Sequence, residues 1–130
     1  MESPVPRQFL RRKDARRRLK CAAAVECHGI THQIEVVDFS SAGLRLDNVT
    51  GLAAGDQVLI AFSPTLAAEG TVIWSVWHKA GVKLSAPLEE TDSLYMYLSD
   101  QADTLERTRK KAVFAVAQEH AAKARASGTD

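Results

Sequence analysis

The chain is poor in cysteine. It has only two, Cys21 and Cys27, which are too few for a fold held together by disulfides. We therefore expect a reducing, cytoplasmic setting. Long apolar runs are also missing. No stretch approaches the roughly 20 residues that cross a bilayer, and the first 15 residues lack the apolar core of a signal peptide. We expect a single domain with no membrane insertion.

Net charge and aromatic residues are scarce as well. Seventeen Lys and Arg nearly balance 16 Asp and Glu, leaving +1 at pH 7, and aromatics make up only 6% of the chain. A strong overall positive field and stacking platforms are the usual means of binding nucleic acid. Their absence argues against a small-barrel nucleic-acid binder, which stays one alternative.

The basic residues are unevenly distributed along the chain. Eight of the 17 lie within the first 20 positions: Arg7, Arg11, Arg12, Lys13, Arg16, Arg17, Arg18 and Lys20. Residues 21–90 contain only Arg45, Lys79 and Lys83. We expect residues 1–18 to form a basic flexible arm on a nearly neutral body.

From Leu19 onward apolar and polar residues alternate, which is the period of a β-strand. Apolar side chains form one face of the first strand: Leu19, Cys21, Ala23, Val25 and Cys27. Turn residues then recur at about ten-residue intervals, so that six short strands fit before Pro87. The pattern predicts an antiparallel barrel or sandwich over residues 19–88.

After Pro87 the apolar spacing becomes helical. It predicts a C-terminal helix over residues 89–126, started by acidic residues, and a disordered tail at 127–130. At 1.5 Å per residue the helix would reach about 50 Å. Its distal part must overhang the barrel, bend near Ser99, or pack on a second subunit. A narrow apolar strip at Ala112, Val113, Val116 and Ala117 would allow oligomerisation or stay solvated.

Two short motifs flank the first predicted strand. Arg12 and Arg16 form R-x-x-x-R, and Asp38, Ser40 and Gly43 form D-x-S-x-x-G. In this order and spacing they resemble the ligand signature of the PilZ domain family, small β-barrel receptors for the second messenger cyclic di-GMP. The resemblance covers roughly residues 10–100. It implies a six-stranded antiparallel barrel followed by a long helix, and a non-catalytic receptor without a cofactor.

The chemistry of these residues suits such a ligand. A guanidinium group forks onto phosphate or onto O6 and N7 of guanine, and the Asp38 carboxylate accepts from the guanine N1–H and N2–H donors. Ser40 can donate to a ligand oxygen and hold its turn by a side-chain to backbone bond. We expect Gly43 to adopt positive φ and to let the ligand approach the backbone.

By resemblance, the arm wraps over the ligand, and this ordering changes the surface that a downstream protein meets. Arg11 directly precedes the first motif arginine, which in the family accompanies a stacked cyclic di-GMP dimer. Lys13 and Arg17 have the same spacing as Arg12 and Arg16. We choose the latter pair because Leu19 then begins the strand at the family's usual offset.

Other interpretations are weaker. A protein-docking module without nucleotide stays an alternative, as some relatives bind only proteins. We expect no metal site, because Cys27 and His28 are neighbours that would face opposite sides of a strand. By alternation, Trp74 belongs to the core and Trp77 to the surface near the last turn.

Overall fold

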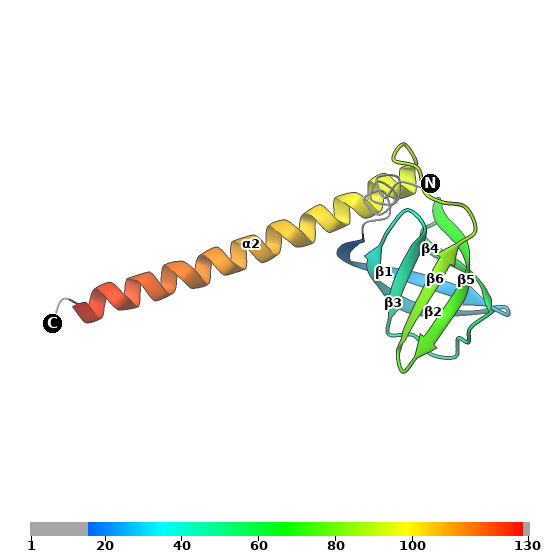
Figure 1. Ribbon diagram of the computed structural model, residues 1–130, viewed down its shortest axis with the longest axis horizontal. Helices are drawn as coiled ribbons and strands as arrows, with labels where there is room; N and C mark the ends of the chain where they lie inside the picture. Colours follow the sequence, from blue (N-terminus) through cyan, green and yellow to red (C-terminus); the bar gives the residue numbers. More distant parts are fainter. Residues whose placement is uncertain (1–15, 129–130) are drawn as a thin grey trace, which may run out of the picture.

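The computed structural model describes residues 16–128, with side chains as far as residue 119. Six antiparallel strands form a closed barrel in the order β1-β2-β3-β6-β5-β4 (Figure 1). The strands and the helix that follows them are β1 (Arg17–Cys27), β2 (Ile30–Phe39), β3 (Gly43–Asp47), β4 (Gln57–Ser63), β5 (Leu66–Val76), β6 (Lys79–Leu84) and α2 (Ser93–Gly128). The predicted fold, a six-stranded antiparallel barrel followed by a long helix, is confirmed.

The alternating residues of β1 form the core as the sequence predicts. All five apolar side chains from Leu19 to Cys27 are buried, while the residues between them are exposed or half-buried. Val25 in β1, Val36 in β2 and Ile60 in β4 are completely inaccessible to solvent. Small and branched side chains therefore fill the barrel interior, as expected for a barrel of this size.

Helix α2 begins at Ser93, four residues later than predicted. The acidic residues expected in its first turn instead form the turn before it, where the Asp92 carboxylate accepts the Glu89 N–H at 2.8 Å. Leu94, Leu98 and Ala102 are buried and join the barrel core. The first turns of α2 thus complete the core and pack mainly on β1.

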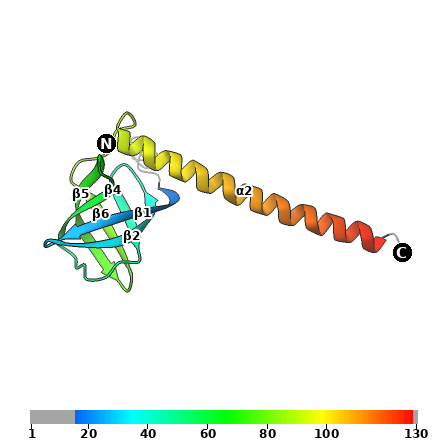
Figure 2. The ribbon, with the colours of Figure 1, turned by 180° about the vertical axis from the view of Figure 1, so that it is seen from behind.

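Beyond this contact the helix continues as one element to Gly128 and leaves the barrel behind (Figures 1 and 2). Its 36 residues correspond to about 54 Å. Of the three arrangements expected from its length, the structure shows the overhang, with no break near Ser99.

The element boundaries differ slightly from those expected. Strand β1 already includes Arg17 and Arg18, which the sequence pattern places in the arm of residues 1–18, and α2 includes residues 127–128 of the expected tail. Residues 1–15 lie outside the described part of the chain, so the flexible arm stays a prediction for them.

Candidate functional site

A row of paired residues crosses five neighbouring strands on the outside of the barrel. Arg18 in β1 pairs with Asp38 in β2, which pairs with Arg45 in β3. Arg45 pairs with Gly81 in β6, and Gly81 pairs with Trp74 in β5. Directly paired residues project from the same face of a sheet. The row thus joins two arginines, a carboxylate and an indole on one surface.

Irregularities in strand pairing put two of these side chains on the outside. The register shifts between Val36 and Asp38, and again between Val72 and Trp74. Val36 and Val72 point into the core, so strict alternation would direct Asp38 and Trp74 inward too. A β-bulge reverses the facing of the residues that follow it. The prediction that Trp74 belongs to the core is wrong for this reason: it is half-buried on the outer surface.

Arg16 immediately precedes β1 and reaches Asp38. Its Nη1 lies 3.2 Å from Asp38 Oδ1, and the two side chains are 42% and 14% exposed. The structure therefore brings together one residue from each predicted motif. Arg16 and Arg18 flank this carboxylate, while Arg45 and Trp74 extend the row beyond it.

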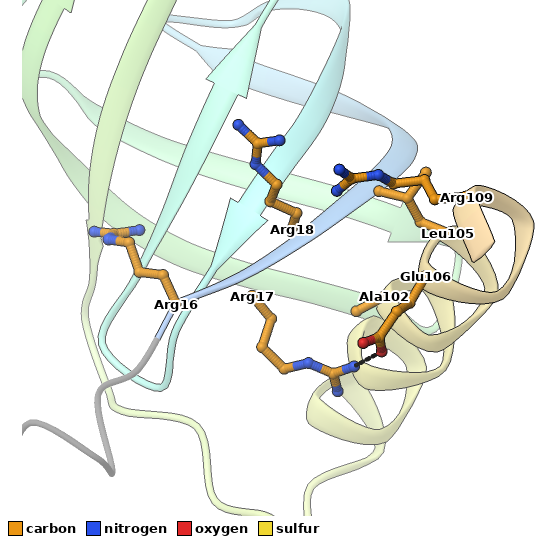
Figure 3. Close-up of a pocket in the computed structure, with 7 residues that line it drawn as sticks. All are labelled: Arg16, Arg17, Arg18, Ala102, Leu105, Glu106 and Arg109. Atoms are coloured by element: carbon orange, nitrogen blue, oxygen red, sulfur yellow. Dashed lines mark ion pairs between the residues drawn. The ribbon is translucent and has the colours of Figure 1, made fainter. Parts of the chain in front are cut away.

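The adjacent Arg17 turns the other way, toward α2. It donates to Ser99 Oγ at 2.9 Å and to Asp103 Oδ1 at 2.7 Å, and it lies 3.9 Å from Glu106. The hydrogen bond from Arg17 holds the pKa of Asp103 below its usual range. Figure 3 shows Arg16 directed away from the helix and Arg17 directed toward Glu106. These two consecutive arginines therefore contact opposite sides of β1: Arg16 contacts Asp38 in the outer row, and Arg17 contacts α2.

Between the start of β1 and the helix lies an open hollow of about 250 Å³. Its lining is mostly charged and comprises Arg16, Arg17, Arg18, Ala102, Leu105, Glu106 and Arg109 (Figure 3). Four of these seven residues are arginines, so the hollow adds positive charge next to the outer row.

Ser40 holds the turn between β2 and β3. Its N–H donates to the Gly43 carbonyl at 2.9 Å, and its Oγ accepts the Ala42 N–H at 3.3 Å. Ser40 is the one polar residue among the described buried ones, at 5% exposure. It fixes the backbone that carries Asp38 on one side and Gly43 on the other.

Gly43 is needed for a different reason from the one expected. Positive φ occurs at other described glycines, Gly29, Gly51 and Gly55, and not at Gly43. A Cβ added to Gly43 would lie 2.7 Å from the Val82 carbonyl oxygen, inside any normal contact distance. The glycine therefore permits close approach of β3 and β6 beneath the site.

Trp74 lies across another glycine of β6. A Cβ on Gly81 would collide with the pyrrole edge of the Trp74 indole. The guanidinium carbon of Arg45 lies 6.0 Å from the Trp74 ring centroid, within reach of a cation–π interaction. Glycine at this position therefore leaves room for the Trp74 indole against β6.

Four of the six predicted site residues lie in the described chain and gather at one edge of the barrel: Arg16, Asp38, Ser40 and Gly43. Arg11 and Arg12 lie outside the described residues. Sequence reasoning missed Arg18, Arg45, Trp74 and the exposed Lys83, which pairs with Gly43. None of these four residues belongs to the two motifs, so only the pairing of the strands identifies them as neighbours of the site.

Comparison with known families assigns the architecture. The PilZ domain pattern matches residues 10–99, which is 90 of the 130 positions. The chain therefore belongs to the PilZ domain family, whose members are generally cyclic di-GMP binding modules and typically non-catalytic. No curated protein matches the chain.

The matched region ends at Ser99, within the second turn of α2. The overhanging part of the helix thus lies beyond the family pattern. No helix in the described chain is both long and apolar enough to span a membrane.

Proposed function

We propose that this protein is a receptor for cyclic di-GMP, with the ligand held over the outer row around Asp38. The observation that carries the proposal is the meeting of Arg16 with Asp38 at 3.2 Å, because it unites two motifs 22 positions apart. The carboxylate would accept from the Watson–Crick edge of one guanine. The arginines would bind phosphate or the O6/N7 edge.

The direction of Arg17 supports the chosen register of the arginine motif. Arg17 is occupied by Ser99 and Asp103 of α2, whereas Arg16 faces the row. In this register Arg12 is the first motif arginine and Arg16 is the second. Arg11 and Arg12 would close over the ligand from the arm, and that ordering would alter the surface offered to a downstream protein.

The surroundings of the site also suit a ligand with several phosphates. Arg18, Arg45 and Lys83 add three exposed cationic side chains to the same outer face. A single cyclic di-GMP carries two negative charges, and a stacked dimer carries four. We infer two ligand molecules per chain, with Arg11 contacting the second.

Calorimetric titration with cyclic di-GMP tests this function directly. We expect binding at micromolar concentration or tighter, with two molecules per chain for wild type and a ratio near one for Arg11→Leu. GTP and cyclic GMP should bind at least about tenfold more weakly, because neither supplies two guanines on one rigid ring. A full-length protein that gives no heat and no shift in melting temperature would reject the receptor and favour a docking module.

Asp38 offers a sharper test within the same experiment. Asp38→Ala removes charge-assisted hydrogen bonds worth about 1.5–3 kcal/mol, so affinity should fall about ten- to hundredfold. Glu35→Ala is the matched control, because Glu35 is a half-buried carboxylate of β2 that pairs with Asp47 rather than with the row. Equal effects of the two changes would contradict the assignment.

We further propose that the overhanging helix pairs with a second copy of the chain. Val113 and Val116 are 70% and 54% exposed with no described element beside them. Arg109 and Glu119 lie five positions to either side of residue 114. In an antiparallel pair centred there, each Arg109 would face the partner subunit's Glu119, so the charges complement each other.

Sedimentation velocity measures this self-association. Wild type should sediment as a dimer, and a Val113→Glu/Val116→Glu variant as a monomer with unchanged nucleotide affinity. Thr108→Glu, which adds one charge to the same helix, serves as the control. A wild-type monomer at tens of micromolar, with and without nucleotide, would exclude the pairing.

A further inference from the structure

Three metal-binding side chains converge at the end of the barrel remote from Arg16. Cys27 ends β1, His28 begins the turn after it, and Asp56 immediately precedes β4. The Cys27 Sγ, a ring nitrogen of His28 and a carboxylate oxygen of Asp56 all lie within 4.8 Å of one another. His28 Nε2 lies 3.4 Å from Asp56 Oδ1.

The turn geometry explains why the sequence pattern concealed this cluster. Alternation along a strand would put Cys27 and His28 on opposite faces. Strand β1 ends at Cys27, however, and His28 adopts a left-handed conformation with φ of 54°. That reversal brings the imidazole back to the side of the thiol. The expectation of no metal site was based on a strand that does not continue through His28.

Asp56 is held in place independently of His28. Its Oδ2 accepts the Ala53 N–H at 2.9 Å, and its backbone carbonyl accepts the Val72 N–H at 2.9 Å. The hydrogen bond from Ala53 is the main reason that the pKa of Asp56 lies below its ordinary value. Asp56 therefore presents a positioned, ionised carboxylate to the other two groups at neutral pH.

The surface next to the cluster favours a cation. A shallow hollow is lined by Glu26, Cys27, His28, Gln57, Val58, Leu59 and Glu69. Two of these residues are carboxylates and none is Lys or Arg. Cys27 is only 6% exposed but is one of the residues that line this hollow, and the His28 side chain beside it is 75% exposed, so the cluster lies at the surface.

We propose that Cys27, His28 and Asp56 bind one Zn²⁺ ion, with water completing a tetrahedral set. A thiolate, an imidazole and a carboxylate are the ligand types that zinc accepts together, whereas Mg²⁺ and Ca²⁺ require oxygen ligands. The ion replaces the proton of the Cys27 thiol, which leaves to solvent. Because zinc competes with that proton for the sulfur, binding should strengthen as pH rises through the neutral range.

Such an ion would join the β1–β2 turn to the segment before β4. Cys27 lies ten residues along β1 from Arg17, or about 33 Å at the strand rise. The zinc site is therefore separate from the outer row, and its presence does not depend on nucleotide binding. Its effect should be to tie down the remote end of the barrel and raise the melting temperature.

The test uses full-length reduced protein without a histidine tag, titrated with ZnCl₂ and, in parallel, with CoCl₂. We expect one Zn²⁺ per chain and a near-ultraviolet thiolate-to-cobalt charge-transfer band. Cys27→Ser should abolish the band, and His28→Gln should weaken zinc binding at least about tenfold. The chain offers matched controls in Cys21→Ser and His32→Gln, which should bind zinc like wild type.

His28 is an exposed side chain at 75%, so His28→Gln keeps the test informative even if Cys27→Ser fails to fold. Zinc binding that is absent from wild type at pH 7.5, or equal in His28→Gln and wild type, would overturn the proposal. A cobalt band lost in Cys21→Ser and retained in Cys27→Ser would overturn it as well. Cyclic di-GMP titration of the same variants should show unchanged affinity, which keeps this result separate from that of the receptor.

Discussion

Arg16 and Arg17 are neighbours in sequence but contact different parts of the protein. Replacing Arg16 by alanine should therefore reduce ligand affinity, whereas replacing Arg17 should reduce thermal stability. Arg16→Ala removes a guanidinium from the outer row and leaves the core intact. Charge-assisted hydrogen bonds to ligand are worth about 1.5–3 kcal/mol, which predicts a loss of affinity of about ten- to hundredfold. The Arg16–Asp38 pair is at the surface, and such pairs contribute about 0–1 kcal/mol to folding.

Arg17→Ala should instead weaken the attachment of α2. The hydrogen bond to Ser99, between half-buried side chains, is worth about 0.5–1.5 kcal/mol. For a domain of roughly 100 residues each kcal/mol lowers the melting temperature by about 4–8 °C. The partly exposed ion pair between Arg17 and Asp103 adds little to the free energy of unfolding. Affinity for cyclic di-GMP should change by less than about threefold, or about 0.6 kcal/mol.

Calorimetry measures the affinity of each variant for cyclic di-GMP, and thermal denaturation followed by circular dichroism measures its melting temperature. We expect Arg16→Ala to lose affinity with a nearly unchanged melting temperature, and Arg17→Ala to have a lower melting temperature with nearly unchanged affinity. Loss of affinity in Arg17→Ala with wild-type binding in Arg16→Ala would refute the reasoning. It would show that Lys13 and Arg17 form the motif. Equal losses of affinity in both variants would indicate a general effect of positive charge.

Three further outcomes follow from contacts described above. Gly43→Ala should lower the free energy of unfolding by about 1–3 kcal/mol, because its Cβ would overlap the Val82 carbonyl; an unchanged denaturation midpoint would contradict the close approach of β3 and β6. Trp74→Ala should weaken nucleotide binding by about 1–3 kcal/mol if a guanine stacks on the indole, while Trp77→Ala, at 88% exposure in the β5–β6 turn, should not; equal binding by both would remove Trp74 from the site. Asp103→Asn should lower the melting temperature only slightly at pH 7, because a partly exposed ion pair contributes about 0–1 kcal/mol. This difference from wild type should vanish as pH falls through the depressed folded-state pKa of Asp103, below about 3.9; a difference that persists at pH 2 would exclude the ion pair as its cause.

Regular alternation made most of the barrel predictable from sequence. The five inward residues of β1 and the change to helical spacing after Pro87 are local patterns, and each corresponds to an observed element. The exposed position of Trp77, expected from the last turn, is confirmed. These features depend only on near neighbours in the chain.

The parts that could not be predicted depend on departures from that alternation. One bulge before Asp38 and another before Trp74 reverse the face of each side chain, and nothing in the local composition marks either position. Arg45 and Lys83 join the site only through pairing with distant strands. The role of Gly43 was misread for the same reason, because the atom it avoids belongs to Val82, 39 positions away.

The overhang of α2 also has a mechanical consequence. Its base rests on β1 through Leu94, Leu98 and the contacts of Arg17, while its far end is about 54 Å from Ser93. Within one chain, the described contacts hold this rod at its base, so it acts as a lever arm: a rotation of about 5° at the base moves the tip by about 5 Å for a rod of this length. A shift of β1 too small to disturb the barrel core would therefore redirect the end of the helix by more than the diameter of a water molecule.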